Sequence, residues 1–149
     1  MGAAAIALIW LGMILGVSFL ATPVKFVVQD LALPVALQVG QATFALFVRV
    51  EWALAAVLLA ACALSWRTRP FALMLTGVLA VFVVLQAVWL LPALDARVAA
   101  IVAGAAPPPS AHHNLYAAFE AAKALLLAAL SITLLRGYVR RKPAVAAES

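Results

Sequence analysis

Four long apolar runs divide this sequence, and each has the length that a helix needs to cross a membrane. A membrane-spanning helix takes about 20 mostly apolar residues, whereas a membrane strand needs alternating apolar and polar positions. The runs here are continuous, so the pattern favours helices. We therefore expect an all-α membrane protein, a bundle of four transmembrane helices, with spans at about residues 3–21, 43–66, 71–91 and 115–135.

The composition supports the same class of protein. Of the 149 residues, 68% are hydrophobic and 10% are charged. Soluble domains have about 45–50% apolar and about 25% charged residues, and so short a chain could not bury this much apolar surface in water. We expect a single transmembrane domain covering residues 1–149. Cys62 is the single cysteine, so no internal disulfide can form.

Basic residues predict the orientation, because they favour the cytoplasmic side of a membrane. Arg67 and Arg69 lie between the second and third spans. Four more basic residues follow the fourth span: Arg136, Arg140, Arg141 and Lys142. An even number of spans puts both places on one side, so we expect both termini in the cytoplasm and residues 136–149 as a basic cytoplasmic tail. The Ala-rich composition suits a GC-rich bacterial genome, and the predicted location is the bacterial plasma (inner) membrane.

The expected partners follow from this distribution of charge. The lipid bilayer surrounds the spans, and the basic tail is expected to contact anionic lipid. Nucleic acid is not expected, because the basic residues gather in a tail and do not form a patch. A second copy of the chain or another membrane protein is left open as a partner.

The two halves of the chain align without a gap at a shift of 69 residues. Proline, glutamate and arginine are rare here, so matches between them carry more weight than matches of Ala or Leu. The pattern predicts two tandem helical-hairpin repeats, related by an axis along the membrane normal. The matched pairs are Pro23 and Pro92, Leu46 and Leu115, Glu51 and Glu120, Leu58 and Leu127, and Arg67 and Arg136.

The fourth span carries one polar face. His113, Tyr116, Glu120 and Lys123 are spaced by three, four and three residues, which puts them on the same side of a helix. Charges at membrane depth nearly always face the interior of a bundle or a water-filled cavity. We therefore expect this face to point inward.

The second span supplies two more charges, Arg49 and Glu51. They are about 200° apart on a helix, so they cannot both meet one partner. We expect one of them to lie near the polar face of the fourth span, in the outer half of the bundle. Lys25 and Gln86 are candidates for further contributions. The residues of the predicted polar site are Arg49, Glu51, His113, Tyr116, Glu120 and Lys123.

Two interpretations of this site stay open. The four deep charges sum to zero, so they can pair as ion bridges that hold the helices in register. They can also line a hydrated site that binds or passes a proton, an ion or a small solute. For Lys25 the alternatives are snorkelling to the outer interface or contact with Glu51 or Glu120.

No cofactor or metal site is expected. His112 and His113 are adjacent and point about 100° apart on a helix, and Cys62 belongs to the other side of the membrane. A metal site needs two or three convergent ligands. The sequence also lacks a phosphate-binding loop, a dinucleotide fingerprint, a Ser-His-Asp set and a zinc-protease motif. These absences argue against an enzyme without deciding the question.

The first span contains a GxxxG motif formed by Gly12 and Gly16. Small residues at this spacing let two helices approach closely. We expect the motif to pack within the bundle.

Several short motifs together give the chain a family resemblance. They are residues 19–26 (FLATPVKF), Arg49-Val-Glu51, Leu94-Asp95-Ala-Arg97, Pro109-Ser110 and the polar face of the fourth span. With these residues the chain resembles a group of small bacterial four-helix integral membrane proteins of unknown function, over nearly its whole length. The resemblance implies the fold and supplies no activity. The functions that compete are a solute- or proton-binding membrane protein and, as the alternative, an accessory or assembly subunit whose charges are structural.

Overall fold

The computed structural model describes residues 2–65 and 69–139, and within these ranges the chain is helical and contains no strand. Four helices are long and apolar enough to cross a membrane, which confirms the predicted fold class. Two of them contain a π-helical segment. The first is α1 (Gly2–Ile14), η1 (Leu15–Ala21) and α2 (Thr22–Val24); the second is α3 (Leu33–Ala63); the third is α4 (Pro70–Leu85), η2 (Gln86–Leu90) and α5 (Leu91–Val102); the fourth is α6 (His112–Val139).

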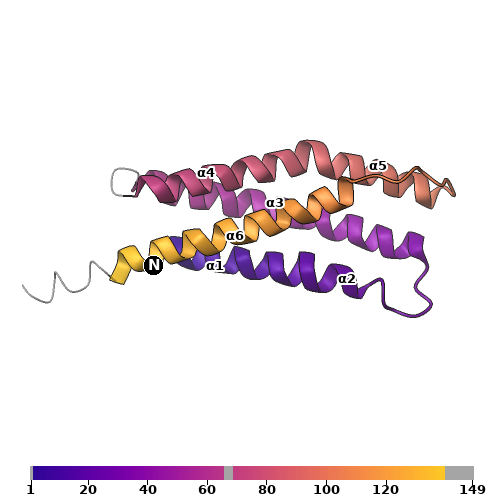
Figure 1. Cartoon of the computed structure of the whole chain (residues 1–149), viewed down its shortest axis with the longest axis horizontal. Coiled ribbons are helices and arrows are strands. Elements are labelled where there is room, and N and C mark those ends of the chain that lie inside the picture. Colours follow the sequence, from indigo (N-terminus) through magenta and orange to yellow (C-terminus); the bar gives the residue numbers. More distant parts are fainter. Residues whose placement is uncertain (1, 66–68, 140–149) are drawn as a thin grey trace, which may run out of the picture.

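The four helices lie side by side along the longest dimension of the molecule (Figure 1). α1 packs against α6 and α3, and α4 packs against α3 and α6, so each helix has two neighbours in a ring. The connections 25–32 and 103–111 lie at one end of the bundle, called the loop end below. The start of α1, the start of α4 and the end of α6 lie at the other end, called the terminal end (Figure 1).

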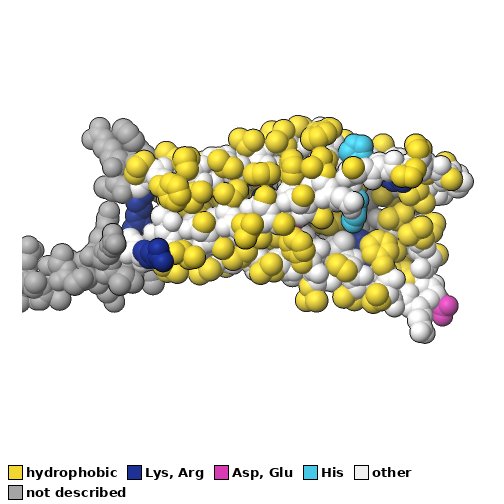
Figure 2. Space-filling model, in the orientation of Figure 1, with side chains coloured by type: hydrophobic (Ala, Val, Ile, Leu, Met, Phe, Trp, Pro, Cys, Tyr) yellow, Lys and Arg dark blue, Asp and Glu magenta, His cyan; other side chains and the backbone are white. Residues whose placement is uncertain are grey.

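The surface agrees with a membrane environment. Figure 2 shows hydrophobic side chains over most of the visible face between the two ends. A helix satisfies its own backbone N–H and C=O groups, so it can stand in hydrocarbon where water offers no hydrogen bonds. The described residues therefore form a multi-pass membrane bundle.

α3 begins ten residues earlier than predicted, at Leu33 instead of residue 43. Ala32 precedes it in an extended conformation. Pro34 lies in the first turn, where backbone N–H groups have no partner within the helix, so the missing N–H of proline costs no hydrogen bond. The connection between the first two spans is thereby limited to residues 25–32. Glu51 consequently lies close to the middle of the 31-residue α3.

The third helix does not stop at Pro92, contrary to the prediction. It continues as α5 to Val102, and Gly104 then turns the chain with a φ of 83°, a left-handed conformation that suits glycine after a helix end. Asp95 and Arg97 are therefore helical residues of α5 and do not belong to a loop.

Both prolines within the long helices follow a π-helical segment. In an α-helix, proline lacks a donor N–H and its ring collides with the carbonyl four residues earlier. Here the N–H groups of Thr22 and Leu91, directly before Pro23 and Pro92, each bond to a carbonyl five residues back. This wider turn accommodates the ring, so both helices pass through their proline without breaking.

The GxxxG motif does not pack within the bundle that a single chain forms, so that prediction is wrong. A Cβ added at Gly12 or at Gly16 would meet no described atom within 4 Å. The interior is filled by large side chains that are fully buried, namely Trp10, Ile14, Leu58, Leu79, Leu127 and Leu130. The predicted second-span end at residue 66, Arg67 and residues 140–149 of the basic tail lie outside the described residues.

Candidate functional site

Lys123 of α6 is the centre of a buried group of charges. Its Nζ donates a hydrogen bond to Glu51 Oε1 on α3, at 2.5 Å, and lies 2.8 Å from Glu120 Oε1 on its own helix. All three side chains are fully buried or nearly so. Because α3 and α6 stand on opposite sides of the ring, the Lys123–Glu51 pair crosses the bundle. These three residues are called the charge cluster below, and their burial confirms the inward orientation expected of them.

Three neutral side chains also donate hydrogen bonds to the two carboxylates. Trp10 Nε1 of α1 donates to Glu51 Oε1 at 2.9 Å. Gln86 Nε2 of η2 donates to Glu120 Oε1 at 2.8 Å, and the Ser18 hydroxyl of η1 donates to Glu120 Oε2 at 2.9 Å. All four membrane-spanning helices thus contribute a group to one network.

Pairing offsets the cost of burying these charges. A charge in hydrocarbon costs about 2.5–3.5 kcal/mol on insertion scales, and removing one partner of a buried pair costs about 3–5 kcal/mol. Lys123 is shared by two carboxylates, so the formal charges of the cluster sum to −1. Among the described atoms, Glu51 Oε2 and Gln86 Oε1 are buried without a hydrogen-bond partner. With both carboxylates ionised, the cluster carries one negative charge beside these spare acceptor atoms.

A cavity of about 280 Å³ reaches this cluster from the loop end, and it is called the Glu120 cavity below. Tyr116 and His113 line it one and two turns before Glu120 on α6, and the Tyr116 ring packs edge-on against Phe44 with centroids 4.9 Å apart. Ser18 also lines the cavity. The remaining lining residues are Phe19, Thr22, Pro23, Phe26 and Ala117.

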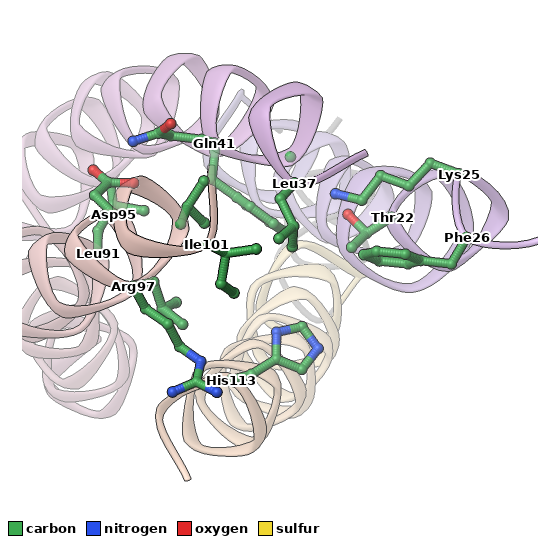
Figure 3. Close-up of a pocket in the computed structure, with 14 residues that line it drawn as sticks. Thr22, Lys25, Phe26, Leu37, Gln41, Leu91, Asp95, Arg97, Ile101 and His113 are labelled. Atoms are coloured by element: carbon green, nitrogen blue, oxygen red, sulfur yellow. The ribbon is translucent and has the colours of Figure 1, made fainter. Parts of the chain in front are cut away.

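A second cavity of about 270 Å³ lies beside it at the loop end and is called the Lys25 pocket below. The two cavities share Thr22, Phe26, Phe44 and His113. Figure 3 shows Lys25 and Asp95 on opposite sides of the pocket, with Leu37 and Ile101 projecting between them. The other lining residues are Gly40, Gln41, Leu91, Leu94, Arg97 and Val98.

Arg49 takes no part in the charge cluster. Its side chain is exposed on the outer face of α3, while Glu51, two residues further on, is fully buried. This division follows from the angle of about 200° between the two positions on a helix. The polar face of α6 therefore meets Glu51 and not Arg49.

Lys25 contacts neither carboxylate of the charge cluster, so that alternative from the sequence is not realised. Its Nζ lies 5.1 Å from the centroid of the Phe26 ring and 5.9 Å from that of Phe44. Burial lowers the pKa of Lys25 below its ordinary value, because a partly desolvated ammonium loses hydration that favours its charged form.

Sequence reasoning missed two members of the network, Trp10 and Ser18. Both lie in a long apolar run, where they pass for ordinary packing residues. A signal was nevertheless present for Trp10, because a buried indole usually needs an acceptor for its N–H group.

The oxygen-rich cluster suits a proton or a small monovalent cation better than a transition metal. Glu120 supplies two carboxylate oxygens and is contacted by the Ser18 hydroxyl and the Gln86 amide nitrogen, and hard cations prefer oxygen ligands. Within the described residues, no three His, Cys, Asp or Glu side chains converge as a metal-ligand set would.

Comparison with protein-family models, with curated proteins and with solved structures finds no match to this chain. The interpretation of the site therefore rests on the geometry of its own residues.

Proposed function

We propose that this membrane protein binds a proton or another small monovalent cation at Glu120. The cation enters from the loop end through the Glu120 cavity. One observation carries the proposal: Glu120 belongs to the buried charge cluster and also lines a cavity of about 280 Å³. A carboxylate that served only as a structural ion pair would need no such access.

The charge of the cluster supports cation binding. Two carboxylates share one ammonium, which leaves one negative charge in a fully buried position. Uptake of one proton or one monovalent cation makes the group neutral and removes the cost of the unbalanced charge. Tyr116 and His113, which line the cavity beside Glu120, provide polar groups along the approach.

The packing on the terminal side of the cluster favours a site that is open from one end only, and not a channel. Leu58 of α3, Leu79 of α4 and Leu127 of α6 lie on the terminal side of the cluster, and each is 0% exposed. Apolar constrictions of this kind exclude water and block ions. Passage of a cation to the terminal end would require a second conformation in which these three leucine side chains move apart.

Infrared difference spectroscopy of the purified protein in lipid tests the proposal. On acidification the wild type should gain the carbonyl-stretch band of a protonated carboxylic acid, and Glu120→Gln should lose that band. The matched control is Arg49→Gln, which changes an exposed charge and should leave the band intact. A band of equal size in wild type and Glu120→Gln would disprove Glu120 as the site. A wild-type spectrum that shows no such band on acidification and does not change when Na⁺ is added would disprove cation binding altogether.

We also propose that the terminal end faces the cytoplasm of a bacterial cell, in the inner membrane. Arg69 and Arg136 lie at this end, and a side chain added at Gly137 would meet the Arg69 guanidinium at 3.4 Å. Such a concentration of basic residues is typical of the cytoplasmic side. Reporter fusions at position 149 should read as cytoplasmic and insertions at position 30 as periplasmic, and the reverse result would invert the proposed topology.

The exposed Arg49 favours a second function, that of an accessory or assembly subunit. Leu46 and Trp52, one turn to either side on α3, are 64% and 46% exposed. A cation on a lipid-facing surface is costly, and an acidic group on another membrane protein would relieve that cost. If Arg49→Leu abolishes the cellular phenotype while Glu120→Gln preserves it, the accessory role replaces the binding role.

A further inference from the structure

The ammonium group of Lys25 is directed into a cavity without a carboxylate partner. Figure 3 shows its nitrogen pointing toward the interior of the Lys25 pocket. Two aromatic faces, Phe26 and Phe44, lie within 5.9 Å of it and supply weak cation–π attraction. The ion pairs within the described residues do not include Lys25. An anion would complete this position.

Gly40 of α3 makes room for the Lys25 side chain. A Cβ added at Gly40 would overlap the Lys25 ammonium nitrogen. Glycine inside a helix is unfavourable by roughly 1 kcal/mol relative to alanine, so its presence here is matched to a close approach. The ammonium therefore lies close to the α3 backbone at Gly40 and beside two rings.

The other charged residues of the pocket have different roles. Arg97 donates hydrogen bonds to the Pro108 carbonyl at 2.5 Å and the Pro107 carbonyl at 3.4 Å, which ties the connection 103–111 to α5. Asp95 lies across the pocket from Lys25 (Figure 3) and repels an anion from that side. The Asp95 charge therefore favours the Lys25 side of the pocket for an anionic group.

Most of the remaining wall is apolar, and its polar members are Thr22, Gln41 and His113. α3 and α5 contribute a continuous set of aliphatic side chains: Leu37, Leu91, Leu94, Val98 and Ile101. A small hydrophilic anion would leave this surface unfilled, whereas an apolar chain would bury it at about 25 cal/mol per Å². The pocket therefore combines the Lys25 ammonium with an apolar wall.

From these observations we infer that the Lys25 pocket binds an amphiphile, with its anionic head group at Lys25 and its apolar tail against the α3–α5 wall. A carboxylate or a phosphate head has the required charge. Amphiphile binding in the Lys25 pocket does not depend on cation binding at Glu120, because Glu120 does not line this pocket.

Native mass spectrometry of the full chain in a nonionic detergent tests the inference with three probes: decanoate, decyl phosphate and decanol. At least one of the two anionic probes should bind more tightly than decanol. Lys25→Met should weaken binding of that probe about tenfold, as expected for the loss of a charge-assisted contact, and should leave decanol unchanged. Gly40→Ala keeps the charge but displaces the ammonium, and it should weaken the same probe.

Lys25→Arg is the rescue variant and should retain binding of the anionic probe. Arg49→Met is the matched control, because it removes an exposed charge elsewhere on the bundle. Equal losses in Lys25→Met and Arg49→Met would overturn the inference, as would equal binding of decanol and both anionic probes. Binding of acetate or inorganic phosphate as tight as that of the ten-carbon probes would disprove the role of the tail. Glu120→Gln should leave probe binding unchanged, so a failure here is distinct from a failure of cation binding at Glu120.

Discussion

The two helical hairpins of this molecule, one made by α1–α3 and the other by α4–α6, bury the same positions with different chemistry. At the predicted shift of 69 residues, both members of each of several pairs are at least nine-tenths buried. These pairs are Trp10 and Leu79, Ile14 and Val83, Phe47 and Tyr116, Glu51 and Glu120, Leu58 and Leu127, and Cys62 and Ser131. The two π-helical turns before Pro23 and Pro92 follow the same shift. These matches support the predicted duplication, which superposition of the two halves would test.

The difference between the halves lies in the charges. The position of Lys123 corresponds to Leu54 in the first half, which packs against the core, and the position of Trp10 corresponds to Leu79 in the second. Two equivalent carboxylates therefore share a single cation. The surplus negative charge of the cluster comes from this asymmetry, so changes that add, move or remove the cation probe the comparison most directly.

Removal of the shared cation should have the largest effect. Lys123→Met leaves Glu51 and Glu120 buried without a counter-charge, and we expect a loss of about 3–5 kcal/mol in the free energy of unfolding. Unfolding in mild detergent, followed by the fraction of folded protein, measures this. The triple variant Lys123→Met, Glu51→Gln, Glu120→Gln has no charge left and should recover most of the loss. A triple variant no more stable than Lys123→Met would show that the cost does not arise from unpaired charge.

Moving the cation to the other half should recover part of that stability. If the hairpins are equivalent, Lys at position 54 approaches the two carboxylates from the first half as Lys123 does from the second. Leu54→Lys combined with Lys123→Leu should then be more stable than Lys123→Leu by about 2 kcal/mol, a fraction of the cost of a broken buried pair. The control is Leu54→Lys alone, which makes the cluster neutral and should cost less stability than Lys123→Leu. A combined variant as unstable as the sum of the two single changes would mean that the shared burial pattern does not extend to the site.

The sequence predicted the helices and the inward charges because both depend on strong local rules. Apolar runs of about 20 residues define spans, and the cost of charge in hydrocarbon forces Glu51, Glu120 and Lys123 inward. The same rules could not locate the ends of α3 and α5. Proline is a reliable stop only in an α-helical register, and the π-helical turn before Pro92 removes the collision that would have ended the helix.

The parts of the site that escaped prediction depend on contacts between helices. The spacing of Arg49 and Glu51 could not decide which of them faces α6. A rotation of α3 about its own axis could turn either one toward the polar face of α6. Trp10 and Ser18 donate to carboxylates that lie 41 and 102 residues away in the chain. Lys25 enters a pocket whose opposite wall belongs to α5, which lies beyond the predicted end of the third span at residue 91. Only the packed bundle brings these groups together.

Removal of the Trp10 N–H group should have a moderate effect, and it sharpens the comparison because Leu79 has no such group. Trp10→Phe keeps a ring in the core and removes one hydrogen bond to Glu51 Oε1. We expect a loss of about 1 kcal/mol, since hydrogen bonds between membrane helices contribute about 0.6–1.7 kcal/mol. Trp52→Phe is the matched control, because Trp52 is 46% exposed and should change stability little. Equal effects of the two changes in the same unfolding experiment would mean that the Trp10 bond to Glu51 contributes nothing.

The smallest expected effect concerns the two prolines, where the halves should behave alike. Pro23→Ala and Pro92→Ala each restore a backbone N–H and remove the ring, so each lets the preceding π-helical turn relax toward α-helix. Relaxation adds a hydrogen bond but rotates the residues on either side, and these opposing terms should leave a change within about 1 kcal/mol in both variants. The change in the free energy of unfolding of the double variant should equal the sum of the two single changes within about 0.5 kcal/mol, because well-separated sites act independently.

Unfolding measurements on the two single variants and the double variant check this prediction. Amide exchange in η1 and η2 reports whether each segment keeps its π-helical register. A change of several kcal/mol at one proline and none at the other would show that the turns have different structural roles, and the comparison of the two hairpins would then hold for the core but not for the proline turns.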